Sequence, residues 1–107
     1  MTVAWSPHAT GLFHGLLSDL ADVLLPESVY NWRTRIISET NQLADFPLIG
    51  TEIPPECFES LPPNADLLRQ IIVKPYRIVY ETAEDEVHIL SIRHSRMLMT
   101  QNDTAWN

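Results

Sequence analysis

The chain has 107 residues, 45% hydrophobic and 20% charged, which is typical of one small globular domain. Fourteen acidic residues oppose seven basic ones, and the net charge of −7 disfavours a protein that coats nucleic acid. No apolar run is long enough to cross a membrane, the N-terminus does not resemble a signal peptide, and the single cysteine excludes an internal disulfide framework. We therefore expect a cytoplasmic protein with no membrane association and no direct nucleic-acid binding.

The first half of the chain predicts one strand and two helices. Residues 2–5 carry β-forming side chains and predict a short strand. Ser6 and Pro7 predict a helix start, because serine is a favoured N-cap and proline is favoured at the first helical position. Apolar residues at helical spacing extend this helix over 7–24, and a second helix is predicted over 26–45. The short connection requires an antiparallel hairpin.

Two surface features of this hairpin have alternative interpretations. Gly11 and Gly15 each lower helix propensity by about 1 kcal/mol relative to alanine. They are either tolerated small residues or places where another backbone approaches closely. The hairpin also carries acidic residues that form either a solvated face or a docking surface for a cationic partner. These residues are Asp19, Asp22, Glu27 and Glu39.

The second half of the chain predicts a loop followed by three strands. Residues 46–66 contain five prolines and a glycine, which predict a long irregular connection. Strands are predicted over 67–74, 76–82 and 86–93, and the short links between them require antiparallel pairing. Residues 97–107 lack periodicity and predict a frayed or partner-dependent tail.

The resulting order, β-α-α-β-β-β, predicts a single α+β domain over residues 1–107. A helical hairpin would pack on an antiparallel sheet in two layers. Its exposed edges would be the strand near Val3 and one of the C-terminal strands, and both need cover.

Five segments, in this order, resemble those of one toxin superfamily. They are Val-Ala-Trp-Ser-Pro-His-Ala at 3–9, L-x-x-F-P-x-x-G at 43–50, L-R-x-x-x-V at 68–73, Y-R-I-x-Y at 76–80, and a last strand over 87–96 that ends in H-x-R. Together they span most of the chain and resemble the ParE branch of the ParE/RelE superfamily.

This resemblance implies a toxin of a type II toxin–antitoxin system. An antitoxin, usually encoded beside the toxin, would neutralise it within a hetero-oligomer. ParE-like members inhibit a type II topoisomerase, either gyrase or topoisomerase IV, whereas RelE-like members are ribosome-dependent mRNA endonucleases. This chain departs from the family in its acidic charge and in a Pro-rich insertion at 52–65.

The endonuclease hypothesis requires an acid–base group and cations that stabilise a pentavalent phosphate. His94 is the candidate acid–base residue, with Arg77, Arg69 and Arg96 as the cations. Alternatively, His94 is only a polar residue that ends the last strand. A third hypothesis is an inactive family member that only binds an antitoxin.

For a toxin that acts by binding, the candidate partner contacts are cations of the second half and one tail aromatic. They are Arg69, Lys74, Arg77, Arg93, Arg96 and Trp106. Arg77 has the alternative of pairing with a carboxylate across the sheet, such as Glu86. Trp106 is alternatively part of a disordered end.

No cofactor or metal is expected. His8 and His14 lie six residues apart, and no neighbouring ligands complete a zinc set. Cys57 lies in Pro-rich sequence with no basic residue close by, so an activated thiol is not predicted.

Overall fold

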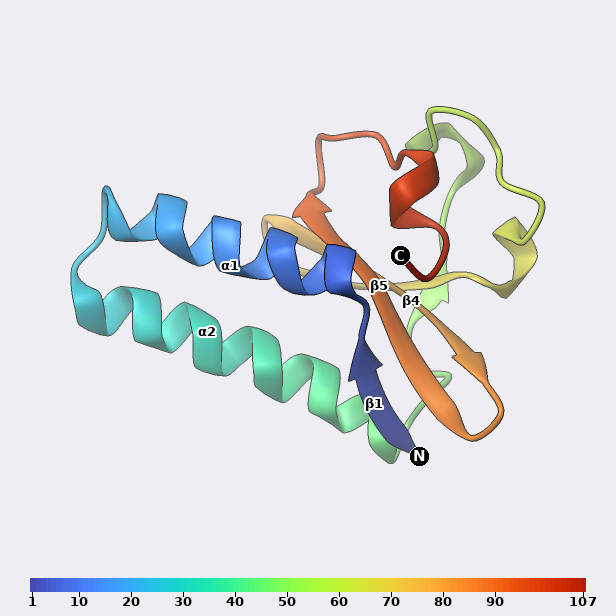
Figure 1. The fold of residues 1–107 in the computed structure, drawn as a ribbon, viewed down its shortest axis with the longest axis horizontal. Helices are drawn as coiled ribbons and strands as arrows, with labels where there is room; N and C mark the ends of the chain where they lie inside the picture. The colour runs from blue at the N-terminus through green and yellow to red at the C-terminus, as the bar shows by residue number, and fades with distance from the viewer.

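The computed structural model describes the whole chain, residues 1–107, as a helical hairpin packed on a five-stranded sheet (Figure 1). The helices and strands are β1 (Thr2–Trp5), α1 (Pro7–Ala21), α2 (Pro26–Asn41), β2 (Thr51–Glu52), β3 (Arg69–Val73), β4 (Tyr76–Ala83) and β5 (Glu86–His94). Short 3-10 turns are η1 (Gln42–Ala44), η2 (Pro55–Cys57), η3 (Ala65–Leu67) and η4 (Gln101–Asp103). No helix is both long and apolar enough to span a membrane.

Both helices begin where the sequence predicts and end earlier. The Ser6 hydroxyl accepts a hydrogen bond from the Ala9 amide at 3.0 Å, and Pro7 opens α1. α1 ends at Ala21 rather than at 24, because the amides of Asp22 and Val23 bond to the carbonyls three residues back, at Asp19 and Leu20. Leu25, which precedes a proline, is extended, with ψ of 151°. α2 ends at Asn41, and η1 continues the predicted helix as a tighter turn.

The sheet has the strand order β1-β5-β4-β3-β2. The pairs β3–β4 and β4–β5 are antiparallel as predicted, but β1 pairs parallel with β5, so the sheet is mixed rather than purely antiparallel. The prediction of antiparallel pairing rested on short links, and no short link joins β1 to β5. One edge is β1 as predicted, whereas the other is β2, which lies inside the Pro-rich segment and not among the C-terminal strands.

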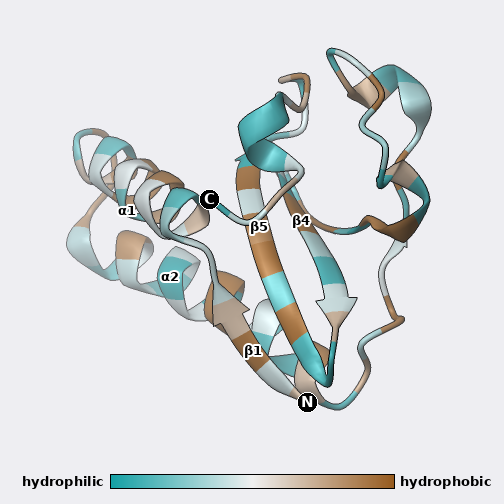
Figure 2. Cartoon of the chain, turned by 45° about the vertical axis from the view of Figure 1, so that its right-hand side comes forward, coloured by the Kyte–Doolittle hydropathy of each residue, from teal (hydrophilic) through white to brown (hydrophobic).

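The sheet buries side chains on both faces. Hydrophobic and hydrophilic residues alternate along β5 (Figure 2). On the helix side, Ala9, Phe13 and Ile36 pack with sheet residues such as Ile78 and Ile89. The opposite face has a second cluster, which consists of Ile53, Phe58, Leu68, Val79, Leu90 and Met99. The Pro-rich segment and the C-terminal residues therefore form a cover over the face away from the helices.

The C-terminal residues pack against the sheet instead of fraying. Met99 is 1% exposed, and its amide and carbonyl make hydrogen bonds with Cys57 and Glu59 of the Pro-rich segment. Asp103 is fully buried. The expectation of a frayed tail is therefore wrong, because buried contacts distant in sequence order a segment that lacks periodicity.

Candidate functional site

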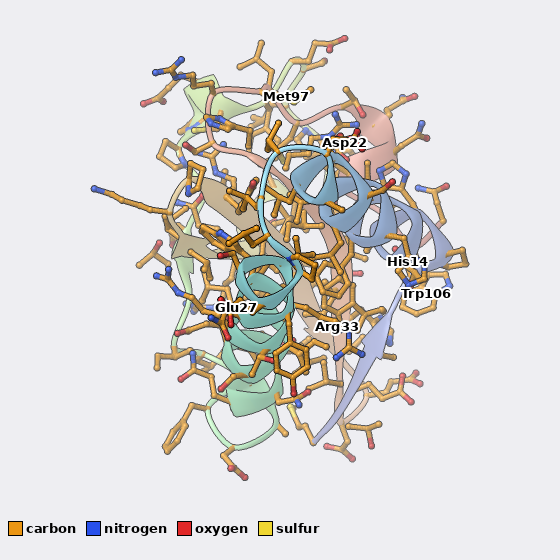
Figure 3. All side chains as sticks on the ribbon, turned by 90° about the vertical axis from the view of Figure 1, so that its left-hand side faces the viewer. His14, Asp22, Glu27, Arg33, Met97 and Trp106 are labelled. Atoms are coloured by element: carbon orange, nitrogen blue, oxygen red, sulfur yellow. The ribbon has the colours of Figure 1, made fainter.

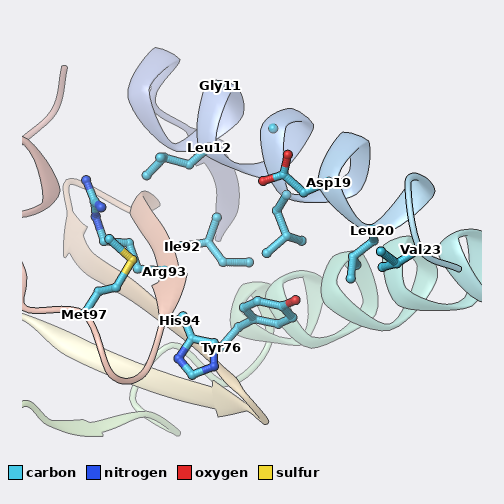
Figure 4. A pocket seen from close by; sticks show the side chains of 12 residues that line it. Gly11, Leu12, Asp19, Leu20, Val23, Tyr76, Ile92, Arg93, His94 and Met97 are labelled. Atoms are coloured by element: carbon cyan, nitrogen blue, oxygen red, sulfur yellow. The ribbon is translucent and has the colours of Figure 1, made fainter.

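α1, the adjoining sheet and the loop after β5 enclose an apolar groove of about 520 Å³, called here the α1–β5 groove (Figure 4). Its apolar side chains come from α1, from the turn after α1, from β5 and from the loop that follows β5. They are Leu12, Leu16, Leu20, Val23, Ile92 and Met97. The groove is open to solvent, since Val23 is 78% exposed and Met97 48%.

The two glycines of α1 line this groove. Gly11 and Gly15 are exposed, and a Cβ built on either one would meet no atom within 4 Å. Packing within the chain therefore does not require glycine at these positions. Because glycine has no side chain, the backbone of α1 is exposed at these two positions along one side of the groove.

The groove has an acidic rim. Asp19 is exposed, lines the groove and is not part of any ion pair in the chain. Burial and the nearby Asp19 carboxylate raise the pKa of Tyr76, which also lines the groove. Asp22 and Glu27 flank the exposed hairpin turn (Figure 3). The side of the groove formed by α1 is therefore acidic, whereas Arg93, which is paired with Asp103, lines its other side.

His94 lines the groove next to Tyr76, and the two rings lie edge to face at a centroid distance of 6.2 Å. Its Nδ1 accepts a hydrogen bond from the Arg96 amide at 3.1 Å. The guanidinium of Arg96 is not paired, and the residue is exposed.

The other two members of the endonuclease hypothesis differ in position: the Arg77 Nη1 lies 3.5 Å from the Ser95 carbonyl, next to His94 in the chain, whereas Arg69 lies farther along the sheet. Arg77 is only 8% exposed, and its Nε donates to Gln70 Oε1 at 2.6 Å on the sheet face away from the helices. It pairs with neither Glu86 nor another carboxylate. Arg69 pairs with Tyr80 on β4, whereas His94 pairs with Tyr76, four residues away on the same strand. Arg69 and His94 are therefore separated by roughly 13 Å along the strand direction.

The remaining residues predicted to contact a partner differ in their exposure and in whether they are already paired within the chain. Lys74 is exposed and unpaired. Arg93 is bound to Asp103, with Nε 2.8 Å from Oδ2. Trp106 is 48% exposed, and its ring lies 4.9 Å from that of His88. Cys57 is a partly buried free thiol packed beside the second cluster.

Sequence reasoning missed a buried polar cluster around Asp103. Its carboxylate accepts hydrogen bonds from Ser91 Oγ at 2.7 Å and from the Thr100 amide at 2.8 Å, and His8 Nε2 lies 2.8 Å from Oδ1. Burial alone raises the pKa of Asp103, but hydrogen bonds from Thr100, His8, Ser91 and Arg93 outweigh it and lower the pKa to about 2. The signal in the sequence was the capping box formed by Thr100 and Asp103. No three His, Cys, Asp or Glu side chains gather as metal ligands.

Comparison with known proteins agrees with this architecture. A model of the family described as the ParE toxin of the type II toxin–antitoxin system, parDE, matches residues 4–99. The chain is also similar to a solved structure of the chromosomal ParDE toxin–antitoxin system from P. aeruginosa, with a TM-score of 0.69 and 17% identity over 88% of this chain and 95% of that one. A search of curated proteins finds no match. By the match over residues 4–99, this chain belongs to the family of ParE toxins of type II toxin–antitoxin systems.

Proposed function

We propose that this toxin acts in the cytoplasm by binding and inhibiting a type II DNA topoisomerase, either gyrase or topoisomerase IV. We further propose that a cognate antitoxin neutralises it by inserting an apolar helix into the α1–β5 groove, which forms a toxin–antitoxin hetero-oligomer. The observation that carries the second part is the groove itself, an open apolar site that no segment of this chain fills.

The shape of the groove fits a helix. Leu12, Leu16 and Leu20 recur every four residues and form one apolar row along α1. The bare backbone at Gly11 and Gly15 allows a second helix to approach more closely than larger side chains would permit. An amphipathic helix that lays its apolar face in this groove would remove exposed Val23 and Met97 from water.

The charges at the rim of the groove indicate which side chains the antitoxin helix should carry. Asp19 is unpaired at the rim, and the adjoining turn carries Asp22 and Glu27. A helix with lysine or arginine beside its apolar face would complement this rim, and electrostatic attraction would raise its association rate. The acidic hairpin thus supports the docking-surface alternative over a merely solvated face.

Binding, rather than phosphoryl chemistry, fits the disposition of the cations. Arg77 and Arg93 are already held by Gln70 and Asp103, and Arg69 is bonded to backbone carbonyls. A mechanism that stabilises a pentavalent phosphate would need such cations to converge beside His94.

The test measures both candidate activities on the purified protein. Supercoiling by gyrase and decatenation by topoisomerase IV are assayed with a readout for trapped cleavage complexes. Messenger RNA integrity is followed in a cell-free translation reaction. We expect trapped, cleaved DNA with intact mRNA. Cut mRNA with unaffected topoisomerases would overturn the proposal and favour an endonuclease.

A further inference from the structure

The turn between α1 and α2 leaves three consecutive aliphatic residues in solvent. Residues 22–27, called here the hairpin tip, are all exposed, with Val23 at 78%, Leu24 at 36% and Leu25 at 68%. The tip projects away from the sheet, whereas both termini lie beside the sheet (Figure 1). Contiguous apolar surface of this kind marks interaction sites in folded proteins.

Leu25 occupies a position where helix chemistry favours a polar side chain. It is the N-cap of α2, makes no capping hydrogen bond, and precedes Pro26 at the first helical position. Ser6 holds the same position before Pro7 in α1, with nearly the same backbone angles (φ −65° and ψ 157°, against φ −67° and ψ 151°). The Ser6 hydroxyl caps α1 by accepting from the Ala9 amide. Serine is among the best N-caps and leucine among the worst, so Leu25 breaks a local rule with no compensating contact inside the chain, which indicates a functional role.

The backbone of the tip is ordered by its own hydrogen bonds. The Leu24 amide donates to the Leu20 carbonyl at 2.8 Å. On the other side of the turn, the Leu25 carbonyl accepts from the amides of Ser28 and Val29 at 3.0 and 3.1 Å. An ordered turn loses less conformational entropy on binding than a flexible one, so the tip is prepared to dock as it stands.

The charge at the tip is negative and is not balanced within the chain. Asp22 and Glu27 flank the aliphatic residues, and neither takes part in the three ion pairs. The sequence has no lysine or arginine before Arg33, which follows Glu27 by six residues and thus lies about 9 Å farther along α2. The C-terminal end of α1 and the N-terminal end of α2 meet at the tip, so their helix dipoles offset each other.

These charges indicate the chemistry of the partner. An apolar pocket whose rim carries lysine or arginine would complement both the aliphatic residues and the carboxylates of the tip. A second copy of this chain fits poorly, since it would bring the same carboxylates and a net charge of −7.

The tip adjoins the α1–β5 groove and shares one residue with it. Val23 lines the groove, whereas Leu24, Leu25 and Pro26 line no hollow of the surface. A pocket that encloses the tip must also enclose Val23. An antitoxin helix packed on Val23 and a partner packed on the tip therefore exclude each other.

We propose that the hairpin tip is the surface with which this toxin engages its protein target, by insertion into an apolar pocket with a basic rim, and that an antitoxin in the groove excludes the target by competing for Val23. The competition and the identity of the target as a topoisomerase rest on the proposed function; the role of the tip in contacting the target does not.

Leu25→Ser tests the tip without weakening the fold, because serine at this position reproduces the cap that Ser6 gives to α1. The midpoint of urea unfolding should therefore equal or exceed that of the wild type. Leu61→Ser is the matched control, since Leu61 is 62% exposed in the Pro-rich segment. Three quantities are measured: inhibition of purified gyrase and topoisomerase IV, growth arrest on expression, and affinity for the protein encoded beside this toxin.

We expect Leu25→Ser to lose at least about tenfold in topoisomerase inhibition and to lose growth arrest, while its affinity for the neighbouring protein stays within about twofold. Leu61→Ser should retain all three properties. Val23→Ser should lose both inhibition and affinity, because Val23 belongs to the tip and to the groove. D22N/E27Q should slow association with the target, because it removes the charge that complements the basic rim.

Full inhibition and growth arrest by Leu25→Ser would overturn the role of the tip and leave the proposed function in place. A wild-type dimer that Leu25→Ser dissociates would also overturn it. Loss of affinity for the neighbouring protein, with inhibition unchanged, would assign the tip to the antitoxin instead. A ternary complex of toxin, target and neighbouring protein would overturn the competition. If the wild type arrests growth without inhibiting either topoisomerase, and Leu25→Ser does not arrest growth, the proposed function fails and the tip is supported against another target.

Discussion

Arg93 and Asp103 are joined by a bifurcated ion pair in which the Arg93 Nε lies 2.9 and 2.8 Å from the two carboxylate oxygens. Through the same carboxylate, His8 at the start of α1 is tied to Thr100 of the C-terminal segment. One buried acid therefore connects the start of α1, 95 residues away in sequence, with β5 and the C-terminal segment.

Replacing Asp103 by alanine should destabilise the fold. The change leaves Arg93 without its counter-ion and Ser91 without its acceptor, at a cost of roughly 3 kcal/mol in the free energy of unfolding. Urea unfolding followed by circular dichroism measures this. Asn102→Ala, at the exposed neighbouring position, is the control and should change stability by less than about 0.5 kcal/mol. Equal stability of the two variants would contradict the role assigned to Asp103.

Stability should fall in acid because of the same carboxylate. The pKa of Asp103 is about 2 in the folded chain against an ordinary value of 3.8, so the unfolded chain takes up the proton at a higher pH. The resulting stabilisation, about 2 kcal/mol, is complete above pH 3.8 and is lost as the pH falls toward 2. Unfolding measured between pH 2 and 6 should show this decline. The decline should be shallower in Asp103→Asn, and an identical profile in the two proteins would argue against this origin.

Two glycine-to-alanine changes should have opposite effects. Gly50→Ala forces a Cβ against the Tyr80 hydroxyl and should cost about 1–3 kcal/mol in the free energy of unfolding. Gly15→Ala adds a methyl group to an open helix face and should stabilise by up to about 1 kcal/mol. Thermal and urea unfolding of both variants check the pair. A Gly50→Ala protein as stable as the wild type would show that the loop before β2 adjusts freely.

Substitutions at the adjacent residues Met97 and Leu98 should differ in their effect on antitoxin affinity, because only Met97 lines the groove. Met97 is 48% exposed and lines the α1–β5 groove, whereas Leu98 is 49% exposed and does not. Met97→Glu places a charge among apolar side chains that an antitoxin helix would cover, so we expect at least about a tenfold loss of affinity. Leu98→Glu should bind as the wild type does. Calorimetric titration with the protein encoded beside the toxin measures both, and equal affinities would exclude the groove as its docking site.

His94→Ala distinguishes binding from catalysis. If the toxin acts by binding a topoisomerase away from this residue, growth arrest should persist at close to its wild-type strength. Loss of an acid–base catalyst would reduce activity by about 10²–10⁴-fold. Growth curves after induction, with protein levels checked by immunoblot, make the comparison. Tyr76→Phe, which keeps the ring packed beside His94, is the structural control.

The order and type of the elements were predictable because their signals are local, except for β2, a two-residue strand inside the segment predicted to be an irregular loop. Ser6 and Pro7 mark the start of α1, and Pro26 opens α2 at the predicted position. The three C-terminal strands begin and end within two residues of their predicted bounds, since alternation and short turns act over only a few residues. The same local motifs carried the resemblance to ParE toxins.

Only the tertiary structure determined which charged side chains have partners within the chain and which surfaces remain exposed to solvent. Arg77 is bound by Gln70 rather than by a cross-strand carboxylate, and Asp103 finds His8 at a sequence distance of 95 residues. The parallel pairing of β1 with β5 and the cover formed by the tail also join distant segments. Periodicity and capping depend on residues only a few positions apart, so the sequence by itself determined the helices and every strand except β2. The partners of buried polar groups, and the grooves between elements, exist only once the whole chain has packed.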